Sequence, residues 1–137
     1  MTIETMGTGL KTRLQTISAF RDVHAPNELP GTINALPCAV VLIEDVEYLM
    51  SFSNSIRVNF RVVVLVGKED QQSRLNDIMD YAERSGAKSI YAAIEGDDTL
   101  GGTADFSVVK SNGGVGYTEW GAENFVSTEF RVECQEQ

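Results

Sequence analysis

Residues 56–67, I-R-V-N-F-R-V-V-V-L-V-G, decide the fold that the sequence predicts. Apolar side chains occupy every second position, namely Ile56, Val58, Phe60, Val62, Val64 and Val66. Successive side chains of a strand point to opposite faces, so these six line one face of a single long strand. A helix would scatter them around its circumference, and β-branched residues are stiff in helices. The other face begins polar and ends apolar, which predicts a central strand covered on both sides only at its far end.

The composition is that of an ordinary globular domain. The 137 residues include 42% hydrophobic and 23% charged side chains, which suits one domain with one core. The formal net charge of −9 opposes binding to DNA phosphates and to anionic membranes. The sequence shows neither a signal-peptide pattern nor a run approaching the ~18 apolar residues of a membrane span. We expect a single soluble domain, residues 1–137, made in a reducing cytoplasm.

Cysteine and histidine offer little catalytic chemistry. Cys38 opens an apolar run and Cys134 ends an alternating one, so we predict two buried free thiols. The sequence has no Cys-x-x-Cys motif and a single histidine, which disfavours a structural zinc site. That histidine, His24, is interpreted as an ordinary loop or strand residue because no recognisable nucleophile motif accompanies it.

The segments before the central strand are predicted as a helix and a hairpin. Apolar residues recur at helical spacing over residues 2–17, with Thr2 as the N-cap. Gly7 and Gly9 either allow a close backbone approach or weaken the helix so that its first turn frays. Residues 21–37 hold all three prolines and are expected to be an extended connection. Residues 38–43 are predicted as a buried strand, and residues 46–52 continue it toward a hairpin with the central strand.

The segments after the central strand are predicted as two helices and two strands. Residues 70–84 form a helix whose inner stripe is Leu75, Ile78, Met79 and Ala82, and Ser89 caps a shorter helix over residues 90–95. Strands are expected at residues 103–111 and 124–134, separated by a glycine-rich turn or bulge at residues 112–116. In the last strand, one alternating set faces inward (Val126, Thr128, Phe130, Val132 and Cys134) and the other faces outward (Ser127, Glu129, Arg131 and Glu133).

This order of elements predicts an α+β fold, a small mixed or antiparallel sheet with helices on one face. A ligand-binding domain of ferredoxin-like type is an alternative, but it requires a βαββαβ order. The consecutive strands before the main helix fit that order poorly.

The loop at residues 96–103, G-D-D-T-L-G-G-T, raises the question of a cation or phosphate site. Counting from Asp97, the calcium-loop positions three, five and twelve hold Thr99, Gly101 and Val108, so that pattern fails. The phosphate-loop pattern also fails, because no Gly-Lys-Ser or Gly-Lys-Thr follows. We interpret the loop as a solvated turn and predict no metal, no cofactor and no catalytic residue.

Several longer stretches, taken in order, carry a family resemblance. They are M-G-T-G-L-K-T-R-L (6–14), A-P-N-E-L-P-G-T-I-N-A-L-P (25–37), F-R-V-V-V-L-V-G-K-E-D-Q (60–71), D-Y-A-E-R-S-G-A-K-S-I-Y-A-A-I-E-G-D-D-T-L-G-G-T (80–103) and G-V-G-Y-T-E-W-G-A-E-N-F-V-S-T-E-F (114–130). Over most of its length the chain resembles the tail terminator, or tail completion, proteins of long-tailed, siphovirus-type bacteriophages. The motifs are structural, and their order and spacing carry the resemblance.

The resemblance implies a structural virion protein and not an enzyme. Such proteins form a ring, typically a hexamer, that caps the head-proximal end of the tail tube, stops tube polymerisation and provides the head–tail joining surface. The implied partners are further copies of the chain, the tail tube protein and the head–tail connector protein. DNA passes through the ring without specific binding, and no membrane is involved. The expected location is the head-proximal end of the virion tail.

A closed ring requires two different patches on each subunit. The apolar hairpin tip, with Leu49, Met50 and Phe52, is one candidate. Tyr117 and Trp120 are the other, because aromatic residues are enriched at interface hot spots, although core packing remains open for Trp120. A charged residue at Phe52 or at Trp120 should leave a folded monomer that does not assemble.

Three acidic residues are candidates for a channel lining, namely Glu95, Asp97 and Asp98. A negative lumen repels phosphate and lets DNA slide through it. The alternative is that they are ordinary surface charges that favour solubility.

The sequence leaves three other functions open. Another neck component, such as a head-completion or connector protein, is also a small ring-former, but it binds the portal and not the end of the tail tube. A small ligand-binding regulatory domain is the second alternative, and an enzyme is a more distant third.

Overall fold

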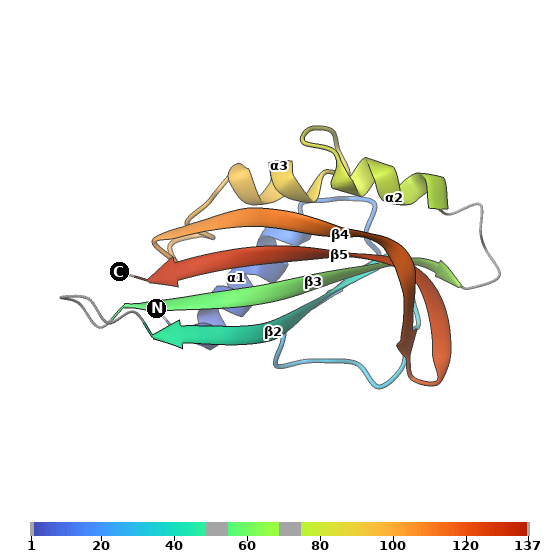
Figure 1. Cartoon of the computed structure of the whole chain (residues 1–137), viewed down its shortest axis with the longest axis horizontal. Helices are drawn as coiled ribbons and strands as arrows, with labels where there is room; N and C mark the ends of the chain where they lie inside the picture. Colours follow the sequence, from blue (N-terminus) through green and yellow to red (C-terminus); the bar gives the residue numbers. More distant parts are fainter. Residues whose placement is uncertain (1, 49–54, 69–74, 137) are drawn as a thin grey trace.

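A computed structural model describes residues 2–48, 55–68 and 75–136 of the chain. In chain order the elements are α1 (Ile3–Leu14), β1 (Asp22–His24), β2 (Cys38–Tyr48), β3 (Ile56–Lys68), α2 (Leu75–Ala82), α3 (Ile90–Glu95), β4 (Phe106–Trp120) and β5 (Glu123–Glu136) (Figure 1). The described strands form one sheet in the order β1-β2-β3-β5-β4, and of these strand pairs only β1 and β2 are parallel. This confirms the α+β prediction. No helix in the described part of the chain is long and apolar enough to span a membrane.

The central strand β3 has the two faces that its sequence predicts. Val58, Phe60 and Val62 on one face are fully buried in the larger of two apolar clusters, here called the main core. On the other face, Val63 and Leu65 are buried in a smaller cluster, while Arg57 and its neighbours nearer the start of the strand are only half-buried. β3 is thus covered on both sides only toward its end, as predicted.

Helix α1 begins where its cap predicts. The Thr2 hydroxyl accepts a hydrogen bond from the Thr5 amide, and the Thr5 hydroxyl accepts one from the Thr2 amide, which makes a capping box. Gly9 lies so close to the loop before β4 that an added Cβ would sit 2.3 Å from the Thr103 hydroxyl oxygen. An added Cβ at Gly7 would sit 2.9 Å from the Pro26 ring. Both glycines therefore allow the expected close approach.

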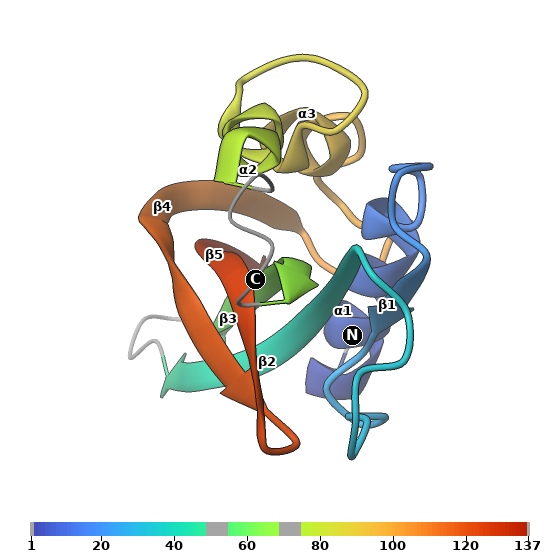
Figure 2. The ribbon, with the colours of Figure 1, turned by 90° about the vertical axis from the view of Figure 1, so that its right-hand side faces the viewer.

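All three helices contribute to the main core and so cover the same face of the sheet. Figure 2 shows α2 and α3 beside β4, and α1 beside β1 and β2. The predicted inner stripe of α2 is wrong in part, because Met79 is 56% exposed and Ala82 is also exposed. Tyr81 is buried instead, with its ring stacked on Phe20 at a centroid distance of 5.2 Å. The helix turns this larger aromatic surface inward, because burying it removes more apolar area from water.

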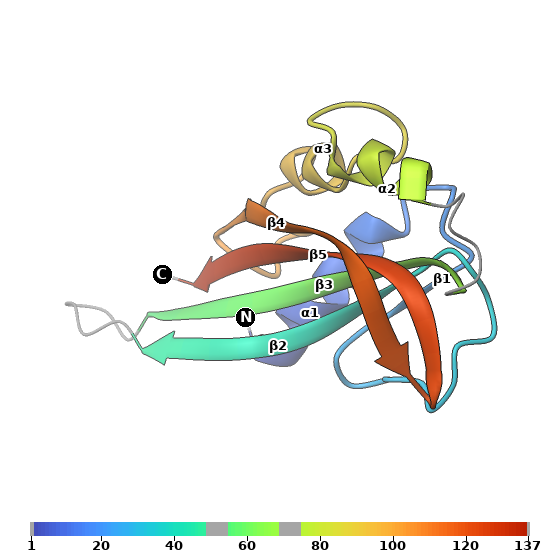
Figure 3. The ribbon, with the colours of Figure 1, turned by 45° about the vertical axis from the view of Figure 1, so that its right-hand side comes forward.

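The opposite face, here called the open face, carries the second cluster, formed by Cys38, Val40, Val63, Leu65 and Phe125. Figure 1 shows the end of the β4–β5 hairpin and the segment before β2 on the side of the molecule away from α2 and α3. In Figure 3 the hairpin end bends away from the direction of the other strands. Ile33, Leu36 and Trp120 from these two segments pack on the second cluster.

The glycine-rich stretch at residues 112–116 is a bulge and not a turn. β4 runs through it as one strand of 15 residues, with register shifts between Val109 and Ser111 and between Asn112 and Val115. The chain reverses at Gly121 and Ala122, which have φ values of 59° and 68°. Two successive positive φ values are typical of the tight turns that match the twist of a hairpin.

Two further findings refine the sequence interpretation. The proline-rich connection includes the short strand β1, which pairs with the first three residues of β2. Cys38 and Cys134 are free and buried, as predicted, and burial raises the pKa of each thiol to about 12.

Candidate functional site

The predicted interface residues fall into two groups. Leu49, Met50 and Phe52 lie outside the described residues. Tyr117 is 53% exposed on β4. Trp120 is half-buried against the second cluster, and its indole N–H donates to the Pro30 carbonyl at 2.8 Å. Its packing is therefore intramolecular in the single chain, and a role toward a partner stays a prediction.

The acidic candidates lie at the end of α3 and in the loop that follows it, near the helix layer. Glu95 is the last residue of α3, and both Glu95 and Asp98 are exposed. The Asp97 carboxylate accepts from the Thr99 hydroxyl at 2.8 Å and from the Gly101 amide at 3.0 Å, and these bonds lower its pKa. Among the described residues, no three His, Cys, Asp or Glu side chains lie close enough to hold a metal ion.

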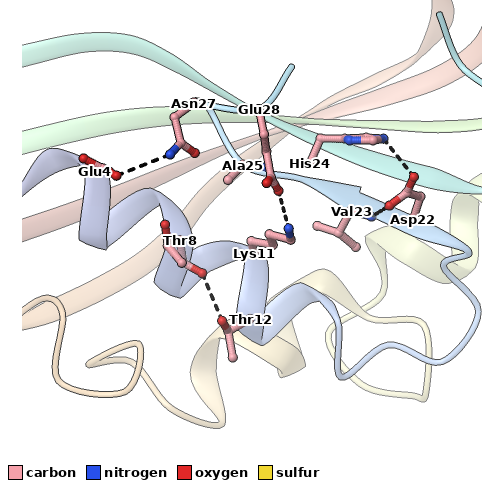
Figure 4. A network of polar contacts seen from close by, with 10 residues as sticks. All are labelled: Glu4, Thr8, Lys11, Thr12, Asp22, Val23, His24, Ala25, Asn27 and Glu28. Atoms are coloured by element: carbon pink, nitrogen blue, oxygen red, sulfur yellow. Dashed lines mark hydrogen bonds and ion pairs between the residues drawn. The ribbon is translucent and has the colours of Figure 1, made fainter. Parts of the chain in front are cut away.

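His24 lies in a network that ties the segment after β1 to α1 (Figure 4). Its Nε2 is 3.3 Å from a carboxylate oxygen of Asp22, two positions earlier on the same strand. In the same network, Glu28 pairs with Lys11 of α1 and accepts from the Ala25 amide at 3.2 Å. The network joins two segments of the fold, which is a structural role for these charges.

The open face of the sheet carries a ladder of charged residues beside the second cluster. In the registers of β2, β3 and β5, Arg57 lies opposite Glu47, and Asn59 lies between Asp45 and Glu133. Arg57 Nε is 2.8 Å from Glu133 Oε1, and Asn59 donates to Asp45 and to Glu47. The Arg57 contact is an ion pair, since its geometry does not meet that of a hydrogen bond. The prediction that Glu133 faces outward is wrong about its exposure, because this pairing leaves it only 9% exposed.

A bulge in β2 adds a second charge pair, which the sequence pattern does not predict. Glu44 is the extra residue where the β2–β3 register shifts between Ile43 and Asp45. Its carboxylate accepts two hydrogen bonds from Arg131 of β5, at 2.7 and 3.1 Å, and these bonds lower the pKa of Glu44. Glu44 therefore reaches across β3. A bulge re-aims a side chain in this way, and alternation of residue types does not predict where one will form.

Both sides of the sheet present long strand edges. β1 covers only the first three residues of β2, so among the described residues no strand pairs with the outer edge of β2 from Val41 to Tyr48. At the other side, β4 pairs only with β5 in the part of the chain that the structure describes. Apolar side chains are exposed along both edges, with Ile43 and Tyr48 on β2 and Val108 and Tyr117 on β4. Unpaired edges of this kind are templates for adding a strand from another chain.

No protein-family model matches the sequence, and no curated protein matches it.

Proposed function

We propose that this chain is a ring-forming tail terminator of a long-tailed bacteriophage, a structural protein without enzymatic activity. The sequence resemblance supports this function. The structural observation that carries it is the sheet with two different unpaired edges. A ring needs a head-to-tail contact between two unlike patches, and the two edges are unlike in length and sequence.

The strand directions favour joining these edges in a closed ring. β2, β3, β5 and β4 are successively antiparallel, so β2 and β4 run in opposite directions. Rotation about an axis parallel to the strands preserves each strand's direction. A neighbouring copy then places its β4 antiparallel to β2, which continues the alternation of the sheet. Each subunit offers one β2 edge and one β4 edge, so the same contact repeats around the ring.

The β4 edge also carries features that restrict its pairing. The bulges after Val109 and after Asn112 interrupt the strand, and Lys110 lies at the first of them. Bulges and edge lysines protect natural sheets from indiscriminate pairing. We therefore place the contact along the regular stretch from Phe106 to Val109. A short contact suits a subunit that assembles on the end of a tube and does not polymerise alone.

A sheet continued around a ring also assigns the channel surface. The helices make the covered face bulkier, so the sheet curves with the helices outside and the open face toward the axis. Among the described residues, the channel then carries intermixed charges, with five acidic residues and four basic ones: Glu44, Asp45, Glu47, Glu129 and Glu133, and Arg57, Arg61, Lys110 and Arg131. This arrangement places Glu95, Asp97 and Asp98 on the helix side, away from the channel.

The first test is the mass of the purified chain, alone, mixed with the tail tube protein and mixed with the portal protein, by light scattering with negative-stain imaging. We expect caps on tube ends and arrested tube growth. Ile43→Lys on the β2 edge should abolish ring formation and capping while the chain stays folded. Leu29→Lys is the matched control, because Leu29 is 46% exposed against 47% for Ile43 and lies in the loop before β2.

The outcomes separate the edge contact from the function. If the Ile43→Lys variant still forms normal caps, the proposed edge contact is wrong, but the proposed terminator function stands. Rings that ignore tubes but bind the portal would indicate a connector. A monomer that neither caps tubes nor binds the portal would reject both functions.

A further inference from the structure

The second cluster has its own cover, which is separate from the helix layer. The cover consists of residues 30–37 before β2 and residues 119–124 at the end of the β4–β5 hairpin. Ile33 and Leu36 from the first segment and Trp120 from the second pack against Val40, Val63 and Leu65 of the sheet. In the part of the chain that the structure describes, the second cluster contains no helix residue.

Two contacts hold the halves of the cover together. The indole N–H of Trp120 donates to the Pro30 carbonyl at 2.8 Å. Gly121, at a φ of 59°, lies so close to Gly31 that an added Cβ would sit 2.7 Å from the Gly31 carbonyl oxygen. The two segments of the cover therefore meet over a small area, where the Trp120 indole forms a hydrogen bond between them.

The cover lies beside a groove and next to a glycine-rich bulge of β4. A groove of about 890 Å³ runs beside it, lined in part by Leu36, Pro37, Val66 and Glu123. On β4, the glycine-rich bulge lies just before the hairpin end, with Gly114 at a φ of 84°. From Thr118 onward, β4 pairs with residues 123–125 of β5, and among the described residues β3 pairs with β5 only up to Phe125. The hairpin end therefore projects beyond the three-stranded part of the sheet.

We infer that the two segments of the cover move away from the sheet together while the main core stays folded. We call the cover a latch for this reason, and we call Trp120 its catch, because the contact of Trp120 with Pro30 holds the two segments closed. Opening exposes the second cluster on the open face, including Cys38. Regions with few buried apolar contacts open at a lower free energy than the core does. The inference does not depend on the ring, since it concerns the single chain.

The two cysteines provide an internal comparison. Cys38 belongs to the second cluster and Cys134 to the main core, and both are fully buried free thiols with a pKa of about 12. A thiol protected to this degree reacts only when its surroundings open. Iodoacetamide labelling of the native chain, read by mass spectrometry of the two peptides, then reports each region separately.

We expect Cys38 to be labelled at least about tenfold faster than Cys134 in the native wild-type chain. Its labelling rate should depend weakly on urea up to 1 M, because opening the latch exposes little surface. The rate for Cys134 should follow global unfolding. Equal rates with equal urea dependence would overturn the inference, because the cover would then open only with the whole domain.

Substitutions at the catch test its role. Trp120→Phe keeps a large ring but removes the N–H donor, and it should raise the rate for Cys38 about three- to tenfold relative to Cys134. Glu119→Gln is the control, since Glu119 is exposed on the same hairpin end, and it should leave the ratio unchanged. An unchanged ratio in a folded Trp120→Phe chain would reject Trp120 as the catch.

A second pair of variants keeps the test decisive should Trp120→Phe fail to fold. Gly121→Ala should raise the Cys38 rate, because the added methyl group meets the Gly31 carbonyl. Gly102→Ala also places an alanine at a positive φ, of 87°, but no atom lies within 4 Å of its added Cβ. The control should leave the labelling ratio unchanged, and an equal increase in both variants would overturn the inference.

Discussion

The two faces of the sheet are built on different principles. The helix-covered face buries a continuous apolar core with residues from α1, α2 and α3. Among the described residues, the open face buries five apolar side chains at one end and presents paired charges at the other. Apolar burial is the dominant favourable term in folding, so the covered face supplies most of the stability. The open face contributes less to stability, and part of its surface carries paired charges in place of apolar contacts.

Large-to-small substitutions on the two faces should show this difference most strongly. Phe60→Ala in the main core should lower the free energy of unfolding by about 3–5 kcal/mol, because it leaves a cavity in a tightly packed region. Phe125→Ala in the second cluster should cost about 1 kcal/mol less, because a small cluster beside a groove relaxes more readily. Urea unfolding of both variants checks this, and equal losses would show that the second cluster is packed as tightly as the main core.

Charge pairing on the open face gives the next effect. Glu133→Gln keeps the shape of the side chain but leaves Arg57 without its nearest carboxylate, at a cost of about 1–3 kcal/mol. The large effect arises because Glu133 is buried, unlike the other acids of this face. Urea unfolding measures the loss, and Glu129→Gln, a half-buried neighbour on the same strand, should change stability far less. A loss at Glu133 no larger than at Glu129 would mean that the pair is effectively solvated.

Helix α1 allows a test of how closely the covered face is packed. Gly9→Ala raises helix propensity by about 1 kcal/mol, but its methyl group would meet the Thr103 hydroxyl and the Leu100 backbone. Overpacking costs about 1–3 kcal/mol, so we expect a net loss of about 1 kcal/mol. Thr8→Ala on the exposed side of the helix should be neutral or slightly stabilising. Thermal unfolding measures the change. A higher melting temperature for Gly9→Ala would show that the loop before β4 shifts at little cost to make room for the methyl group.

The sequence predicted the covered face better than the open face, and the reason is physical. Alternation along β3 and helical spacing along α1 follow from burial on one side, which leaves a period in the sequence. The exchange of Met79 for Tyr81 on α2 depends on the ring of Phe20, which is distant in sequence. Glu44 in its bulge and Trp120 against Pro30 depend on contacts between strands and loops far apart in the chain. Such contacts have no period, so the candidate surfaces emerged only with the fold.

The smallest expected effect concerns the exposed charge pair of the open face. Arg131 holds the pKa of Glu44 below its usual value, so the folded state binds this proton less readily than the unfolded state does. The stabilisation by Glu44 is therefore fully present above about pH 4.5 and is lost as the pH falls through the lowered pKa of the folded state. Glu44→Gln should flatten the acid side of the stability profile slightly, and salt should reduce the difference from the wild type, because the pair is exposed. Unfolding free energies between pH 3 and pH 7, at low and high salt, test this. A difference that persists unchanged at high salt would mean that the bulge holds Glu44 and Arg131 away from solvent, as burial does for Glu133.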